Sequence, residues 1–174
     1  TAEQSRALAE IDADMRASVP MSRLLQGDVG SGKTVVAAVA LAHAVDTGYQ
    51  AALMAPTEVL AQQHDQNLRD LLGGVGIETV LLKGDQGAEA RRDAYERIAD
   101  GRAQVTVGTH ALIQKGVEFD KLGLVITDEQ HRFGVRERQG LRRKGRRPDV
   151  LVMTATPIPR SLALLMYGSA CSTS

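Results

Sequence analysis

A glycine-rich loop near the N-terminus constrains the fold of this chain most strongly. Residues 27–34 read Gly-Asp-Val-Gly-Ser-Gly-Lys-Thr, which matches the pattern G-x-x-x-x-G-K-[ST]. The loop joins a predicted strand, 23–26, to a predicted helix, 35–46. Such a loop points several backbone N–H groups at one spot beside the positive end of the helix dipole, and so it binds phosphate. The residues expected to hold the phosphates of a nucleotide are Gly27, Asp28, Gly30, Ser31, Gly32, Lys33 and Thr34.

Two of these residues have expected roles in catalysis and metal binding. Lys33 is expected to place its positive charge on the β- and γ-phosphates of ATP, and the Thr34 hydroxyl to bind Mg²⁺. A loop of this kind also needs a carboxylate at the end of another strand. Asp128 and Glu129 directly follow the apolar run 122–127. We expect Asp128 to hold the metal and Glu129 to activate the attacking water, although an acidic pair at a helix N-terminus is an alternative interpretation.

Short apolar runs and longer amphipathic runs alternate along the chain. This alternation predicts βαβ units and a parallel sheet, and the continuous apolar runs fit strands that are covered on both faces. We therefore predict a three-layer α/β/α fold with about six parallel strands and with ligands at their carboxyl ends. The expected strands are 23–26, 51–55, 77–82, 104–107, 122–127 and 149–153, and the expected helices are 1–18, 35–46, 58–72 and 88–99. The small, polar residues 169–174 are expected to form a disordered tail.

Composition excludes several other classes of protein. Lys and Arg number 21 and Asp and Glu number 21, so a nucleic-acid partner must be met by a local patch rather than by overall charge. The segment 132–147 is such a patch, or else a solvated face. The single cysteine, Cys171, excludes an internal disulfide and a cysteine-based zinc site, and it fits a reducing compartment such as the cytoplasm. No apolar run approaches the ~18 residues that span a bilayer, so no membrane partner is expected. The chain lacks an initiator Met and a signal peptide, so it is expected to have been processed or cut from a longer one.

Several segments, taken in chain order, resemble the motifs of a known family. The ordered set resembles the first motor domain of superfamily-two helicases, and among these the RecG family of branch-migration helicases. The resemblance extends over residues 1–168 and implies a RecA-like, ATP-binding motor domain. The matching segments are 1–4 (Thr-Ala-Glu-Gln), 27–34, 55–64 (Ala-Pro-Thr-Glu-Val-Leu-Ala-Gln-Gln-His), 108–112 (Gly-Thr-His-Ala-Leu), 128–135 (Asp-Glu-Gln-His-Arg-Phe-Gly-Val) and 154–160 (Thr-Ala-Thr-Pro-Ile-Pro-Arg).

The resemblance also implies roles for individual residues. Gln4 is expected to read the adenine, and His131 to join Lys33, Asp128 and Glu129 in catalysis. A DNA-binding group is expected to hold one strand by its phosphates, after strand ends opposite the nucleotide edge. That group is Thr57, Gln62, Gly108 and Thr109, and the residues expected to couple the nucleotide to the DNA are Gln130, His131, Thr154 and Thr156. Helix capping is the alternative role for Thr57, and a Thr-Pro turn is the alternative for residues 154–157.

The implied activity is that of an ATP-dependent, double-stranded DNA translocase. It would use ATP and Mg²⁺ to remodel branched DNA, by fork regression and branch migration of Holliday junctions, in repair and recombination. Two alternatives remain open: the motor domain of a transcription-repair coupling translocase, and a P-loop ATPase that does not act on nucleic acid. The second motor domain and the wedge domain of the RecG family are not expected within these residues. Because a second-lobe arginine is worth about 10³–10⁵ in rate in related reactions, we expect this chain alone to bind nucleotide weakly and to hydrolyse it very slowly.

Overall fold

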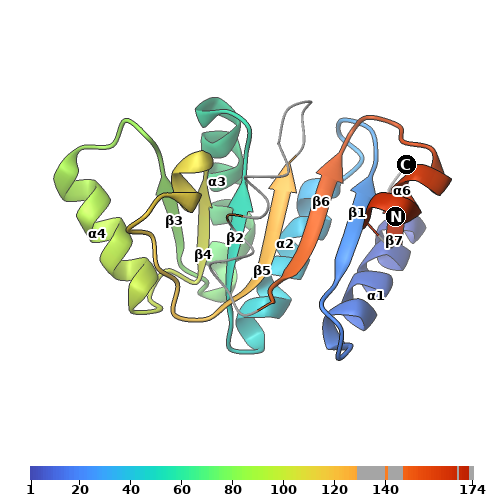
Figure 1. Ribbon diagram of the computed structural model, residues 1–174, viewed down its shortest axis with the longest axis horizontal. Coiled ribbons are helices and arrows are strands. Elements are labelled where there is room, and N and C mark those ends of the chain that lie inside the picture. The colour runs from blue at the N-terminus through green and yellow to red at the C-terminus, as the bar shows by residue number, and fades with distance from the viewer. Residues whose placement is uncertain (129–139, 141–146, 168, 173–174) are drawn as a thin grey trace.

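The computed structural model describes residues 1–128, 140, 147–167 and 169–172. Its centre is a seven-stranded sheet in which every described pairing is parallel (Figure 1). The strand order is β3-β4-β2-β5-β6-β1-β7. The strands are β1 (Ser22–Gln26), β2 (Gln50–Met54), β3 (Thr79–Leu82), β4 (Val105–Gly108), β5 (Leu122–Asp128), β6 (Asp149–Thr154) and β7 (Ser169–Ser172).

Helices cover both faces of this sheet, which confirms the predicted three-layer α/β/α fold. Helices α1, α2 and α3 pack on one face, while α4, the short 3₁₀ segment η2 and α6 pack on the other. Both chain ends lie at the β7 side of the sheet (Figure 1). The helices are α1 (Ala2–Arg16), α2 (Lys33–Asp46), α3 (Glu58–Leu72), α4 (Ala88–Ala99) and α6 (Arg160–Tyr167), with 3₁₀ segments η1 (Gly73–Val75) and η2 (His110–Ile113).

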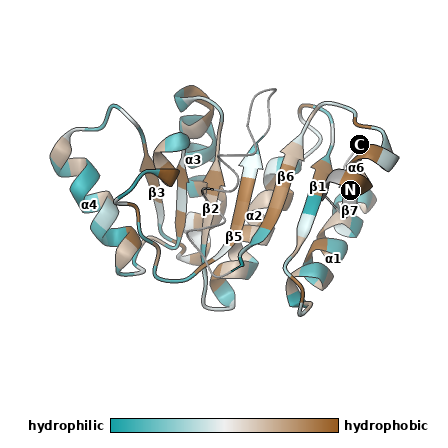
Figure 2. Cartoon of the chain, in the orientation of Figure 1, coloured by the Kyte–Doolittle hydropathy of each residue, from teal (hydrophilic) through white to brown (hydrophobic). Residues whose placement is uncertain are grey.

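Strands β2, β5 and β6 are mostly hydrophobic, as expected for strands with both faces covered (Figure 2). Successive side chains of a strand point to opposite faces, so neighbours in the sequence belong to different cores. In β1, Leu25 packs with α1–α3, whereas Leu24 packs with α4, η2 and α6. In β5, Ile126 lies in the core with α1–α3, whereas Val125 lies in the core with α4, η2 and α6. The two cores hold the sheet rigid, and the rigid sheet fixes the positions of the loops at its carboxyl edge.

The prediction of a disordered tail is wrong for residues 169–172. These residues form β7, which pairs with β1 in a register that sets Arg23 beside Ser169 and Gln26 beside Ser172. An unpaired edge of β1 would leave backbone N–H and C=O groups without partners, and β7 satisfies them. With β7 the sheet has seven strands rather than about six. The sequence did not predict β7, because its small side chains lack the apolar pattern of a strand.

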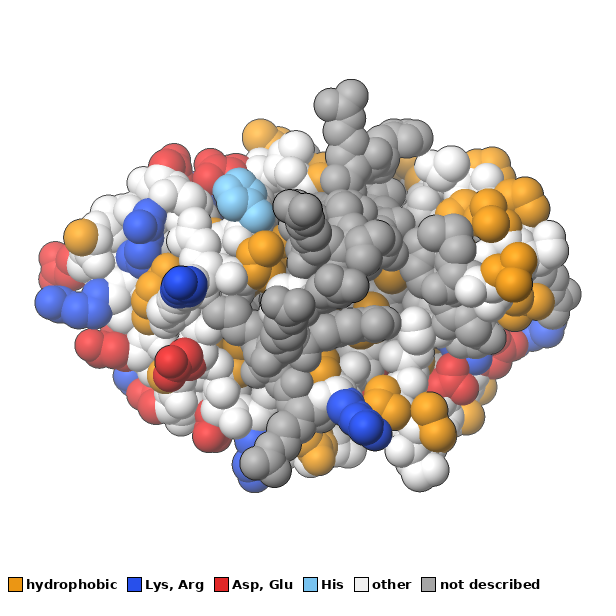
Figure 3. Space-filling view, in the orientation of Figure 1, with side chains coloured by type: hydrophobic (Ala, Val, Ile, Leu, Met, Phe, Trp, Pro, Cys, Tyr) orange, Lys and Arg blue, Asp and Glu red, His pale blue; other side chains and the backbone are white. Residues whose placement is uncertain are grey.

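Three helices differ from their predicted form, and of these α2 begins at Lys33 rather than at residue 35. The N-terminal helix ends at Arg16, two residues earlier than expected, and its start is fixed by a capping box between Thr1 and Gln4. Helix α6 had no predicted counterpart, and its Leu162, Leu164 and Leu165 are exposed at the surface. Hydrophobic side chains gather at this end of the molecule in Figure 3. Among the described residues, no helix has both the length and the apolar character to cross a membrane.

Candidate nucleotide and nucleic-acid site

The carboxyl ends of three adjacent strands form the centre of the site. Strands β5, β6 and β1 lie side by side, and the glycine-rich loop follows β1. Asp128 ends β5 and Thr154 ends β6, so both residues meet the loop at one edge of the sheet. Parallel strands bring these segments together although they are far apart in the sequence. This is the edge at which α/β sheets bind their ligands.

Two glycines give the loop its shape. Gly30 has φ 82° and Gly32 has φ 84°, a backbone conformation that other residues adopt only with strain. Helix α2 begins directly after Gly32, which has no side chain with which to cap the first turn. The first N–H groups of α2 therefore remain available to an anion, and the helix dipole favours a negative charge there.

The Lys33 amine is held inside the loop. Its Nζ donates hydrogen bonds to the carbonyl oxygens of Gly27, at 2.5 Å, and Asp28, at 2.7 Å. Desolvation lowers the pKa of Lys33, whereas the negative charges of Asp128 and Asp28 act to raise it. A lysine so placed is a point charge at the floor of the loop, where it can move from carbonyl oxygens to the stronger acceptors of a phosphate.

A cavity of about 320 Å³ lies beside the loop and contains the expected metal ligands. Gly30, Gly32, Lys33, Thr34 and Asp128 all line it. A hydroxyl and a carboxylate are oxygen ligands, which suit Mg²⁺, and this ion is commonly held by one or two carboxylates together with substrate phosphates. No cluster of three His, Cys, Asp or Glu occurs among the described residues, so the donor set does not resemble an all-protein metal cage. The residues fit a nucleotide with its Mg²⁺.

One cavity residue has a contact that sequence reasoning did not assign. The Nε2 atom of His64 lies 2.7 Å from Oδ2 of Asp128. His64 belongs to a segment quoted above only for its resemblance to a DNA-binding motif. The two residues are 64 positions apart, and only the adjacency of β2 and β5 brings α3 next to Asp128. Sequence reasoning could not find this contact, because it depends on the order of the strands in the sheet.

Gln4, for which the resemblance implies adenine recognition, lies against the glycine-rich loop. Its Nε2 donates to the carbonyl oxygen of Ser31 at 3.0 Å, and its Oε1 accepts from the backbone nitrogen of Thr1 at 2.8 Å. Helix α1 is in turn tied to β1, because the buried Arg23 pairs with Glu10 and Asp14. Gln4 therefore caps α1 and contacts the glycine-rich loop (the phosphate loop, 27–34) with the same side chain.

The end of β6 is hydrogen-bonded directly to the glycine-rich loop. The carbonyl oxygen of Thr154 accepts from the Gly27 backbone N–H at 3.1 Å. The Thr154 hydroxyl accepts from the N–H of Thr156 at 3.0 Å, which closes a tight turn. Thr154 is buried and Thr156 is exposed. Residues 154–156 therefore form the turn that was the alternative interpretation, and Thr154 also contacts the loop through Gly27.

The four residues expected to contact DNA divide into two pairs. Thr57 and Gln62 are exposed, while Gly108 and Thr109 are buried. The Thr57 hydroxyl accepts from the Leu60 N–H at 3.2 Å, so Thr57 does cap α3. The buried Thr109 hydroxyl has no hydrogen-bond partner within the described part of the chain. The two segments are joined, since the Ala55 N–H donates to the Gly108 carbonyl at 2.8 Å.

The expected location of this DNA-binding group needs a correction. It was expected at strand ends opposite the nucleotide edge, but all described strands are parallel. Thr57 follows β2 and Gly108 ends β4, so both lie at the carboxyl edge that also carries the phosphate loop. They are separated from the loop sideways, along the sheet, because β2 and β4 lie beyond β5.

Gly108 is required by packing whatever its role toward DNA. A Cβ at this position would lie 2.6 Å from the Leu82 carbonyl oxygen and 3.0 Å from Leu112 Cγ. Because the first neighbour is backbone, Gly108→Ala is expected to lower the free energy of unfolding by about 1–3 kcal/mol. Urea unfolding followed by circular dichroism measures the change. Gly74→Ala is the control, because nothing lies within 4 Å of its Cβ, and equal stability of the two variants would contradict the packing argument.

Three predicted functional residues lie outside the described residues. They are Glu129, Gln130 and His131. The basic segment 132–147 also lies outside them except for Gly140 and Arg147. The predicted roles of these residues in catalysis, coupling and DNA binding stay predictions.

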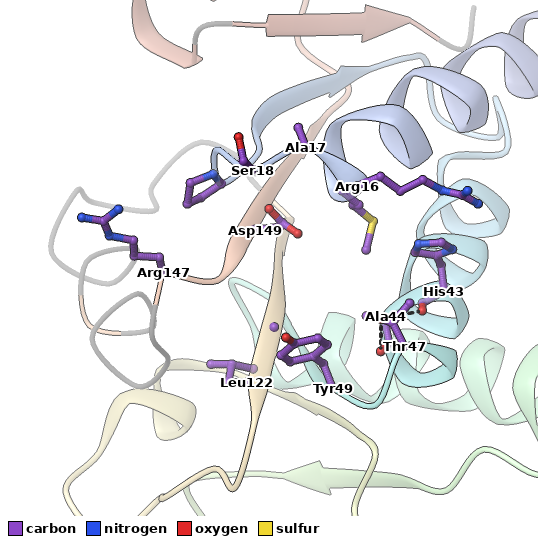
Figure 4. Close-up of a pocket in the computed structure, with 13 residues that line it drawn as sticks. Arg16, Ala17, Ser18, His43, Ala44, Thr47, Tyr49, Leu122, Arg147 and Asp149 are labelled. Atoms are coloured by element: carbon purple, nitrogen blue, oxygen red, sulfur yellow. Dashed lines mark hydrogen bonds between the residues drawn. The ribbon is translucent and has the colours of Figure 1, made fainter.

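A second, larger cavity lies at the opposite edge of the sheet. It has a volume of about 510 Å³ and is lined by the ends of α1 and α2 and by the starts of β5 and β6 (Figure 4). His43, Tyr49, Arg147 and Asp149 are among its polar lining residues. Burial raises the pKa of Asp149, whose Oδ1 accepts from the Met21 N–H at 2.6 Å. The cavity has neither a glycine loop nor a helix N-terminus, so the smaller cavity beside Lys33 remains the candidate nucleotide site.

Comparison with known proteins agrees with this geometry. The family model of the DEAD/DEAH box helicases matches residues 1–165. ATP-dependent DNA helicase RecG of Streptococcus pneumoniae is 56% identical over 168 residues, which are 97% of this chain and 25% of that protein. RecG of Escherichia coli K12 is 54% identical over 172 residues, again 97% of this chain and 25% of that protein. The chain therefore spans about a quarter of the length of these relatives.

Solved structures show the same likeness. A structure described as RecG bound to a three-way DNA junction superposes with a TM-score of 0.87 at 46% identity, covering 99% of this chain and 23% of that one. The helicase domain of Hef from Pyrococcus furiosus superposes with a TM-score of 0.73 at 21% identity, covering 97% of this chain and 36% of that one. The second match supports the fold alone. The RecA-like fold predicted from the sequence is confirmed.

Proposed function

Because the chain belongs to the DEAD/DEAH box helicase family, we propose that it is the ATP-binding half of a RecG-type motor that translocates on double-stranded DNA. The intact protein would hydrolyse ATP to remodel branched DNA, by fork regression and by branch migration of Holliday junctions, in repair and recombination. Its likeness to RecG proteins over 97% of its length and to a RecG bound to a three-way junction supports this substrate class. A motor acting on chromosomal DNA with ATP would work in the bacterial cytoplasm.

One observation carries the proposal most directly. The phosphate loop is bonded through Gly27 to Thr154, at the end of the strand next to Asp128. The glycine-rich loop, Asp128 and Thr154 therefore lie at one edge of the sheet, where they would bring nucleotide phosphates, a metal ligand and the coupling segment together. A DNA motor needs such a connection, because a change at the phosphates must reach the segments that hold the strand. A small-molecule ATPase has no need for the further motif-like segments along this edge.

We propose the following roles for individual residues. The N–H groups of the loop and Lys33 would bind the phosphates, and Gln4 would recognise the adenine. Thr34 and Asp128 would hold Mg²⁺, which supplies charge stabilisation at the phosphates when bound. Glu129 and His131 are proposed from the sequence to orient and activate the water. Thr57 and Gln62 are exposed and would contact DNA phosphates, which positions a strand without reading its sequence.

The partner that completes the site is proposed to be a second motor domain of the same protein. In two-lobed motors ATP binds between the lobes, and the second lobe supplies an arginine that stabilises transition-state charge. This chain corresponds to about a quarter of its relatives, which leaves room for that domain in the longer protein. ATP binding would then close the two lobes and hydrolysis would open them.

Stimulation by DNA tests the proposed function against a P-loop ATPase that does not act on nucleic acid. We expect ATP turnover by the intact protein to rise about tenfold or more when a three-way or four-way DNA junction is added. Phosphate release is the measurement, with linear duplex of the same length as the comparison. Turnover that is equal with and without any DNA would contradict the proposal.

A further inference from the structure

The contact between His64 and Asp128 has no part in the scheme above. We propose that His64 is a positioning residue, which holds the Asp128 carboxylate in the orientation that receives the metal of the bound nucleotide. This inference rests on the proposed function, because it assumes that Asp128 serves a nucleotide-bound Mg²⁺. It adds a residue on another helix to the metal site.

The hydrogen bond is short and shielded from water. His64 Nε2 lies 2.7 Å from Asp128 Oδ2, and the two side chains are 12% and 14% exposed. A carboxylate only accepts hydrogen bonds, so the Nε2 atom must carry the hydrogen and donate it. A hydrogen bond to a charged acceptor is stronger than one between neutral groups, and shielding from solvent strengthens it further. The contact is therefore able to fix a side-chain orientation.

Helix α3 presents His64 to the cavity for a simple geometric reason. Leu60, His64 and Asn67 follow one another at spacings of four and three residues, and all three line the cavity. The neighbouring stripe, which includes Ala61 and Leu68, is buried in the core and prevents the helix from rotating. The side chain of His64 thus reaches the metal site from a rigid element.

The bond leaves one oxygen of Asp128 for the metal. His64 occupies Oδ2, and within the described residues no other hydrogen bond to this carboxylate occurs. Oδ1 is the atom that can face an ion shared with Thr34, which lines the same cavity. A carboxylate already fixed in one orientation loses less conformational freedom when the ion binds. Partners that orient metal ligands in this way typically contribute about 10–100-fold to metal affinity or activity.

A comparison of nucleotide affinity with and without metal tests the role. The dissociation constant of ADP is measured by calorimetry on the 174-residue chain in excess EDTA and in excess Mg²⁺. The dissociation constant in EDTA divided by the constant in Mg²⁺, called the metal ratio below, measures how much the metal strengthens binding. A residue that only supports the fold would change both constants together, whereas a residue that positions Asp128 changes the ratio.

Three substitutions at His64 separate the hydrogen bond from the shape of the side chain. His64→Leu removes the donor, and His64→Asn retains a polar group that is too short to reach Asp128. Both are expected to reduce the metal ratio by about tenfold or more while leaving affinity in EDTA near the wild-type value. His64→Gln places an amide N–H at a similar reach and should retain most of the ratio. Gln66→Leu is the matched control, because Gln66 is exposed on the same helix and bonds to Asp70.

Each outcome decides the question. Loss of the ratio in His64→Leu and His64→Asn with retention in His64→Gln supports the proposal. A wild-type ratio in His64→Asn, or a parallel loss of both affinities in every variant, would overturn it. Failure of the folded wild-type chain to bind any nucleotide would instead contradict the proposed function, and this inference with it.

Discussion

The isolated 174-residue chain is expected to hydrolyse ATP at least about a thousandfold more slowly than the intact protein supplied with branched DNA. The composition of the cavity gives the reason. Lys33 is the only lysine or arginine among the described residues that line it. In phosphoryl transfer, an arginine supplied from a second domain stabilises the charge of the transition state and is worth about 10³–10⁵ in rate. Without that domain the phosphates would be bound but poorly activated.

Release of inorganic phosphate, measured for both proteins at saturating MgATP and the same junction DNA, gives the two rates. The intact protein carrying Lys33→Ala sets the background from contaminating ATPases. Mixing the isolated chain with a separately prepared second domain should recover part of the lost rate. Rapid, DNA-stimulated turnover by the isolated chain would contradict the two-domain account.

Asp128→Asn is expected to lower ATP turnover by the intact protein about a hundredfold or more. The amide is nearly isosteric and can still accept a hydrogen bond from His64, so the shape of the site is retained. It lacks the negative charge that holds Mg²⁺, and a catalytic metal is worth several kcal/mol of transition-state stabilisation, of which each ~1.4 kcal/mol is tenfold in rate.

Asp70→Asn is the matched control for this substitution. Asp70 is an exposed acid near the end of α3, and its Oδ1 accepts a hydrogen bond from Gln66 Nε2 at 3.1 Å. ATP turnover by the Asp70→Asn protein should equal that of the wild type. Activity of Asp128→Asn within about tenfold of the wild type, at saturating Mg²⁺, would argue against a metal role for Asp128.

Much of the fold follows from local pattern in the sequence. Helices α3 and α4 have the predicted bounds, 58–72 and 88–99, because glycines follow or precede their amphipathic runs. The strand predicted from Ile77 begins instead at Thr79. The reason is nonlocal, since the Ile77 N–H donates to Leu72 and the Glu78 N–H donates to the Gln104 side chain. The apolar, β-branched composition of this segment does not reveal that these hydrogen bonds delay the start of the strand.

Some residues of the candidate site can be predicted from short sequence motifs, whereas others depend on the order of the strands. The phosphate loop and Asp128 are readable because each is a short motif with its own chemistry. His64 was not assigned, since its partner is fixed by the adjacency of β2 and β5 and not by spacing in the sequence. Strand order also determines that Thr57 and Gly108 share an edge with the loop. Strand β7 was missed because small polar residues pair through their backbone alone.

Calorimetric titration of the 174-residue chain with MgATP and with ADP, beside Lys33→Ala, tests the central claim most directly. Lys33 supplies the only full positive charge that the described loop offers to phosphate, and a hydrogen bond to a charged group is worth about 1.5–3 kcal/mol. The account predicts that the wild-type chain binds one nucleotide and that Lys33→Ala weakens binding by about tenfold or more. Lys121→Ala, an exposed lysine at the opposite edge of the sheet, should bind like the wild type. Equal affinities of the wild type and Lys33→Ala, or no binding by a folded wild-type chain, would contradict a phosphate-loop nucleotide site.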